Sequence, residues 1–190
     1  VYPHMNSIGG DGFWLISADG KAPIAVDGCG AAASGATRDY YGAQGHTVIP
    51  SRGPYAANTV AGTLSGWAEA HAISRELGGK LPMSRLVEDA VWSAENGFAV
   101  TATQQELTES KFEELKDSPG FVRTFLLDGK LPKEGQLMKF PALGATLRHI
   151  GEHGPLDFYS GALAKTIAAD LQRCGAPVTI DDLAAHKAQR

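Results

Sequence analysis

Two histidines four positions apart, in His149-Ile150-Gly151-Glu152-His153, form the first stretch whose residue types could do chemistry. This spacing fits the motif of inverted zinc proteases, in which both rings share a zinc ion on one helical face. Gly154-Pro155 would end such a helix at once, and Gly151 would weaken it. We therefore predict two solvated histidines at a helix end rather than a zinc site.

The glycine-rich stretch Ile8-Gly9-Gly10-Asp11-Gly12 is the second candidate. It resembles a phosphate loop by its glycine content alone. A phosphate loop must open a helix, so that free N–H groups face the anion. This stretch precedes a predicted strand, and its glycines therefore indicate a turn at which backbones cross closely.

Cys29 is the third candidate, because it stands between Gly28 and Gly30 at the end of a predicted strand. A nucleophilic thiol needs a base and a lowered pKa, which no residue nearby in the sequence supplies, although a distant histidine could. We predict that Cys29 forms part of a pocket wall rather than a nucleophile, with a small buried thiol as the bland alternative. The only other cysteine is Cys174, which excludes a disulfide scaffold and leaves one bridge possible.

A β-hairpin would position Cys29. Residues 13–18 form its first strand, Asp19-Gly20 a tight turn, and Ile24-Ala25-Val26 its second strand. The first strand is apolar on both faces, which predicts burial on both. The second strand would aim Asp27–Gly30 from a rigid sheet into a site.

The apolar period changes from two to 3.6 near Asn58, which predicts an α+β fold with a helical layer after the hairpin. Residues 37–51 read as a loop, and residues 126–131 as a turn around Asp128-Gly129. The first helix would be capped by Asn58 or Thr59 and end at Gly78-Gly79. Further helices are expected after Pro82 up to Gly97, over 103–115 with a capping box at 103–106, from Ser118-Pro119, over 140–153, over 156–174 up to Gly175, and from a cap at 179–182.

The composition describes an ordinary globular protein. The chain has 190 residues, enough for one domain with a core, and is 43% hydrophobic and 20% charged. A net charge of −4 without a basic stripe argues against a nucleic-acid partner, and no apolar run is long enough for a membrane helix. No basic region accompanies Val1, so we expect no signal peptide. We also expect that the sequence is truncated at both ends. The compartment stays open between cytoplasm and periplasm, and we favour the cytoplasm.

Longer segments add a resemblance that composition does not show. They are IGGDGFWLI, AVDGCGAAASGATRDYY, NTVAGTLSGWAEAH, GGKLPMSRLVEDAVWSAENGFAV, IGEHGPLDFYSGALAKTIAADL and VTIDDLAAHKA, in this order over nearly the whole chain. With them the chain resembles the middle of the large subunit of γ-glutamyltranspeptidase-family enzymes. The resemblance also accounts for the zinc-like motif, which matches a family helix followed by a Gly-Pro break.

Members of this family are N-terminal-nucleophile hydrolases. The proenzyme cuts itself, and the freed N-terminal threonine of the small subunit attacks an amide. The resemblance places that threonine and the oxyanion-hole glycines beyond residue 190. Val1 cannot be the nucleophile, because its side chain has no heteroatom. We therefore expect no catalytic residue in this chain. It implies part of an αββα sandwich and a partner small subunit from the same precursor. We expect a small amide substrate and no cofactor or metal.

One departure from the family pattern bears on the substrate. The pattern after the second strand is Asp-Phe-Arg-Glu-x-Ala-Pro, whose arginine pairs with the α-carboxylate of the γ-glutamyl group. Cys29 stands at that arginine's position, and Ala57-Asn58 replaces the usual Pro-Gly. Because a thiol cannot replace a bidentate arginine, the substrate-binding role of Cys29 points away from glutathione. The chain instead resembles the branch that includes oxamate amidohydrolase.

Three hypotheses about function follow. The first is an amidohydrolase that releases ammonia from a small amide such as oxamate, with its threonine outside this chain. The second is a γ-glutamyl transferase/hydrolase or acylase with relocated recognition, and the third is a non-catalytic binding or structural domain. In each case we expect residues 1–57 to contribute hairpin, loop and pocket, and residues 58–190 to form the helical region of one continuous domain.

Overall fold

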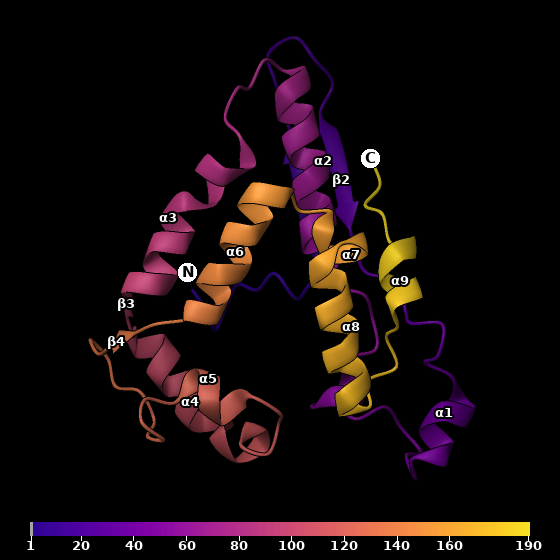
Figure 1. The fold of residues 1–190 in the computed structure, drawn as a ribbon, viewed down its shortest axis with the longest axis vertical. Coiled ribbons are helices and arrows are strands. Elements are labelled where there is room, and N and C mark those ends of the chain that lie inside the picture. The colour runs from indigo at the N-terminus through magenta and orange to yellow at the C-terminus, as the bar shows by residue number, and fades with distance from the viewer. Residues whose placement is uncertain (1) are drawn as a thin grey trace.

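The computed structural model describes residues 2–190, so the interpretations that concern Val1 lie outside the described residues. The fold is of α+β type, as predicted, with helices arranged around small antiparallel sheets (Figure 1). The elements are, in chain order, β1 (Gly12–Ile16), β2 (Ile24–Gly28), α1 (Arg38–Ala43), a 3₁₀ turn η1 (Pro54–Ala56), α2 (Thr63–Glu76), α3 (Met83–Asn96), β3 (Phe98–Ala99), α4 (Ala102–Leu115), α5 (Phe121–Phe125), β4 (Leu137–Met138), α6 (Pro141–His153), α7 (Asp157–Ser160), α8 (Ala162–Cys174) and α9 (Ile180–Ala185).

The predicted hairpin is present. Strands β1 and β2 are antiparallel, with Gly12 opposite Gly28 and Ile16 opposite Ile24. A turn is present at Asp19-Gly20, where the Lys21 amide donates to the Ala18 carbonyl at 3.1 Å. The predicted tight connection is wrong, because residues 17–23 join the strands and only Gly20 among them has a positive φ, of 71°.

Strand β1 is exposed, which contradicts the prediction of burial on both faces. Phe13 is 68% exposed and Leu15 is 78% exposed. Trp14 faces the other way, toward α2, where its ring lies against Gly66. The apolar pattern is real, but the described residues cover only one side of the strand.

Helix α2 begins at Thr63 and has no side-chain cap, so the predicted cap at Asn58 or Thr59 is wrong. Tertiary partners satisfy its first N–H groups instead. The amide of Thr63 donates to the carbonyl of Gly10 at 2.9 Å, and the amide of Ser65 donates to the Tyr159 hydroxyl at 2.9 Å. The helix ends before Gly78 as predicted, with φ of 92° at that glycine.

Helices α3 and α6 pack antiparallel and carry much of the core (Figure 1). Gly151 permits their close approach, because a Cβ there would lie 3.0 Å from the Ser84 Cα. At the other end, Arg148 pairs with Glu95 at 2.6 Å. Leu86, on the outer side of α3, is exposed. The main core is formed by Ala33, Val60, Leu64, Met83, Val87, Val91, Leu147, Ile150, Phe158, Tyr159, Ala164, Val178 and Leu183.

Several helix starts lie a few residues from their predicted positions. Helix α1 occupies part of the expected loop, because the Thr37 side chain accepts from the Tyr40 amide and caps it. Thr101, rather than a box at residues 103–106, caps α4. Helix α5 begins after Gly120, which is left-handed at φ 83°, rather than at Ser118-Pro119.

The turn at Asp128-Gly129 is confirmed, since both residues have positive φ. The short strands β3 and β4, which pair Phe98 with Met138, were not predicted. Two residues per strand are too few to show a period.

The single helix predicted over residues 156–174 is wrong, because the chain breaks at Gly161 into α7 and α8. The Asp157 carboxylate lies at the start of the following helix, α8, and accepts from the amides of Ala162 and Leu163 at 3.2 and 3.0 Å. A Cβ at position 161 would lie 1.7 Å from the Asp157 Oδ1, so glycine is required at the break. The stop at Gly175 is confirmed.

Helix α9 begins with the predicted cap, a reciprocal capping box between Thr179 and Asp182. Beyond it the chain returns to the hairpin. The backbone of Gln189 pairs with that of Asp27 through two hydrogen bonds of 2.8 and 2.9 Å. The Ala188 amide also donates to the Ser65 hydroxyl at 2.6 Å, which ties this segment to α2.

Candidate functional site

The loop after β2 carries Cys29 and is held from three sides. The Asp27 carboxylate accepts from the Cys29 amide at 2.8 Å, and the Asp11 carboxylate accepts from the Gly30 amide at 2.9 Å. A Cβ at Gly30 would lie 1.6 Å from the Val60 carbonyl oxygen, so only glycine allows this approach. The loop backbone is therefore fixed, and the Cys29 side chain projects from a rigid base.

Among the described residues, the Cys29 thiol is exposed. Its Sγ lies 3.7 Å from the Asp11 Oδ2. The negative charge of Asp11, followed by desolvation and by Asp27, raises the pKa of the Cys29 thiol. The thiol therefore stays protonated at neutral pH and is a poor nucleophile. Its role in binding substrate stays a prediction.

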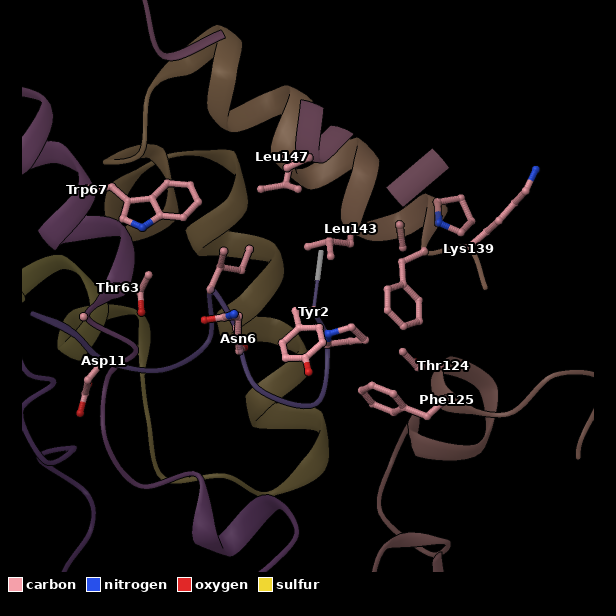
Figure 2. A pocket seen from close by; sticks show the side chains of 18 of the residues that line it. Tyr2, Asn6, Asp11, Thr63, Trp67, Thr124, Phe125, Lys139, Leu143 and Leu147 are labelled. Atoms are coloured by element: carbon pink, nitrogen blue, oxygen red, sulfur yellow. The ribbon is translucent and has the colours of Figure 1, made fainter. Parts of the chain in front are cut away.

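Asp11, which accepts from the Gly30 amide of this loop, also lines a cleft of about 980 Å³ (Figure 2). Its walls come from residues 2–8, from β1 and α2, and from α5 and α6. Asp11 and Thr63 lie at one end, and Phe125 and Lys139 at the other. Asp11 thus joins the Cys29 loop to the cleft, although Cys29 itself is not among the residues that line it.

Two buried side chains behind the loop were missed by sequence reasoning. Burial raises the pKa of Tyr159 to about 12, and its hydroxyl donates to the Ala61 carbonyl at 2.7 Å. The His186 ring lies 5.2 Å from the Tyr159 ring and is 9% exposed, and its Nε2 has no hydrogen-bond partner. Burial lowers the pKa of His186, and Asp11 partly opposes that shift. Both side chains are therefore neutral at pH 7.

The glycine-rich stretch forms a backbone crossing, as predicted, at Gly12. A Cβ there would meet the Thr63 Cα at 3.4 Å, whereas Gly10 has open space around it. The Gly10 carbonyl and the Tyr159 hydroxyl already occupy the amides of Thr63 and Ser65 at the start of α2. This helix start is thus satisfied within the protein and has little left to offer a phosphate.

Of the two histidines near the end of α6, His153 is exposed as predicted, whereas His149 is half-buried. The His149 Nε2 lies 2.9 Å from the Asp157 Oδ2, and the two side chains are 29% and 17% exposed. The His149 and His153 rings lie 4.2 Å apart.

Within residues 2–190, no group of three or more potential ligands could hold a metal ion. Both cysteines in this range are free. Within the same range, no helix has the length and apolarity required to span a membrane.

Comparisons with known proteins agree with one another. The family model for Gamma-glutamyltranspeptidase matches residues 1–190. The chain is 51% identical, over its whole length, to 36% of the oxamate amidohydrolase proenzyme of Klebsiella pneumoniae. It is 38% identical to the glutathione hydrolase-like YwrD proenzyme of Bacillus subtilis, of which it covers 35%. Among solved structures, a cephalosporin acylase from Bacillus halodurans matches 99% of the chain with a TM-score of 0.86 and 30% identity, over 35% of that protein. The chain thus spans about a third of these relatives.

Proposed function

The chain belongs to the γ-glutamyltranspeptidase family, and from this premise we propose that it is the large-subunit portion of a self-processing amidohydrolase. The substrate is a small amide such as oxamate, and the nucleophile is a threonine outside these 190 residues. Its hydroxyl oxygen forms an ester with the amide carbon, the C–N bond breaks, and the nitrogen leaves with a proton as ammonia. Water then hydrolyses the ester and regenerates the threonine.

The observation that carries this proposal is the chemistry of the loop at residues 27–30. Cys29 stands at the position of the family's carboxylate-binding arginine, and its thiol is neutral beside Asp11. A charge-assisted contact from an arginine to a carboxylate is worth about 1.5–3 kcal/mol. Its loss weakens γ-glutamyl recognition by about one to two decades, which favours a smaller amide.

The exposed hairpin supports the proposed partner, a small subunit from the same precursor with an N-terminal threonine. Phe13 and Leu15 present apolar surface on the side of β1 that α2 does not cover. A strand apolar on both faces is normally buried on both. Two relatives are themselves named as proenzymes, and the chain covers about a third of each.

Two alternatives remain. A γ-glutamyl transferase/hydrolase is suggested by the relative named glutathione hydrolase-like, and an acylase by the solved cephalosporin acylase. The other alternative, a non-catalytic domain, would require a full-length sequence without threonine or serine at a self-cleavage junction.

The test uses the full-length precursor after self-cleavage, which a denaturing gel reports as two bands. Ammonia release from oxamate is measured with a coupled assay, and γ-glutamyl-p-nitroanilide is measured in parallel. We expect a higher kcat/KM for oxamate. A variant with alanine at the junction threonine is the control and should stay uncleaved and inactive. Preference for the γ-glutamyl anilide would contradict the proposal.

A further inference from the structure

We propose that Asp11 is a specificity-determining residue that acts together with position 29 and makes this wall of the site reject the α-carboxylate of a γ-glutamyl group. That carboxylate is separated from the amide carbon by three carbons, whereas the carboxylate of oxamate is bonded directly to the amide carbon. The inference rests on the proposed function, because it places the loop at residues 27–30 in the substrate pocket. Asp11 immediately precedes β1, lines the cleft, and reaches across to the loop that follows β2.

The position of the Asp11 carboxylate is fixed by both of its oxygens. Oδ1 accepts from the Gly30 amide at 2.9 Å, and Oδ2 lies 3.7 Å from the Cys29 Sγ. Gly30 is also packed closely, since a Cβ there would lie 1.6 Å from the Val60 carbonyl oxygen and 3.3 Å from the Asp11 Oδ1. The carboxylate therefore stays beside any side chain that occupies position 29.

The surroundings leave this negative charge unneutralised. Within residues 2–190, Asp11 forms no ion pair with a lysine, arginine or histidine. Asp27, the other charged group at the loop, is also acidic. The titratable side chains behind the loop, Tyr159 and His186, are neutral at pH 7. The α-carboxylate of a γ-glutamyl substrate at this wall would meet two like charges. Oxamate has no charged group at that distance from its amide carbon.

This geometry also predicts what an arginine at position 29 would do. Its guanidinium would lie within reach of the Asp11 carboxylate, and the two would form a charge-assisted pair. The new cation would then be occupied by Asp11 and would not bind an α-carboxylate. Restoring γ-glutamyl recognition thus requires both Cys29→Arg and removal of the Asp11 charge.

The experiment is a double-variant cycle in the full-length, self-cleaved protein. Wild type, Asp11→Asn, Cys29→Arg and the double variant are compared. Asn keeps the size of Asp11 and an oxygen that can accept from the Gly30 amide. The substrates are γ-glutamyl-p-nitroanilide and 4-aminobutyryl-p-nitroanilide, which differ only by the α-carboxylate. The readout is the ratio of their kcat/KM values. Asp19→Asn, which removes the same charge from the hairpin connection, is the matched control.

We expect Cys29→Arg alone to change this ratio little and the double variant to raise it about tenfold to a hundredfold. Asp11→Asn alone should raise it a few-fold, and Asp19→Asn should leave it unchanged. A Cys29→Arg variant that matches the double variant would overturn the proposal. A ratio that stays the same in all variants would overturn it as well.

A second readout does not depend on activity. The rate of Cys29 alkylation by iodoacetamide is measured against pH in the same protein, with Cys174 as the internal reference. Because Asp11 raises the pKa of the Cys29 thiol, Asp11→Asn should speed alkylation of Cys29 at neutral pH. An unchanged rate would show that the carboxylate does not face the thiol in the assembled protein. Neither readout uses oxamate, so the proposed function can fail separately.

Discussion

Replacement of Tyr159 by phenylalanine tests how the start of α2 is held. The Tyr159 hydroxyl accepts from the Ser65 amide at 2.9 Å and donates to the Ala61 carbonyl at 2.7 Å. Helix α2 has no side-chain cap of its own, and the ring of Tyr159 is buried. Tyr159→Phe keeps the packing and removes the one group that satisfies both backbone partners.

The size of the effect follows from the two groups that lose their partner. A buried donor or acceptor left unsatisfied costs about 1–3 kcal/mol, so the pair costs about 2–6 kcal/mol. At about 1.4 kcal/mol per decade, the opening equilibrium at the start of α2 should rise by about one and a half to four decades.

The assay is amide hydrogen exchange by mass spectrometry on the full-length protein, read at the peptide that contains Ser65. Tyr41→Phe is the matched control, because Tyr41 is also buried but its hydroxyl donates to a single loop carbonyl, that of Tyr55, at 2.9 Å. The control should leave exchange at Ser65 unchanged. Equal exchange at Ser65 in both variants would refute this account of the helix start.

Four other outcomes are expected. Burial lowers the pKa of His186 below its unfolded value of about 6.5, so the unfolded state binds a proton at a higher pH than the folded state does. The free energy of unfolding should therefore be constant above about pH 6.5 and decrease as the pH falls below it. In denaturation measured against pH, His186→Gln should make this decrease less steep. Gly30→Ala should destabilise the protein by more than about 2 kcal/mol in thermal denaturation, whereas Gly10→Ala, with open space around it, should not. Asp157→Ala should cost about 1–2 kcal/mol in urea denaturation, because the first amides of α8 lose their acceptor. The isolated 190-residue chain should release no ammonia from oxamate above background, and turnover there would reopen Cys29 as a nucleophile.

Features that depend on neighbouring residues were predictable from the sequence. Helix α6 ends before Gly154, and the capping box of Thr179 and Asp182 opens α9, because both signals act within a few residues. The start of α2 was not predictable, since its partners Gly10 and Tyr159 lie far away in the chain.

The same distinction applies to the candidate site, where local signals were predictable from the sequence and contacts between distant residues were not. Cys29 stood out because of its flanking glycines, its place after a strand and its departure from the family pattern. The contact between Asp11 and Cys29 could not be seen, because it depends on the register that sets Gly12 opposite Gly28. The burial of β1 was predicted from a true apolar pattern, but the described residues do not supply the second covering layer.

The pairing of Asp27 with Gln189 has a consequence for the order in which the site is assembled. Contacts between residues this far apart form late, because a long stretch of chain must be closed before they add stability. On the ribosome, Asp27 leaves the exit tunnel early, and its partner follows only after all the helices between them. The loop with Cys29 is therefore completed from behind by a segment that emerges after these helices, so the loop takes its final shape only when the helical layer is already in place.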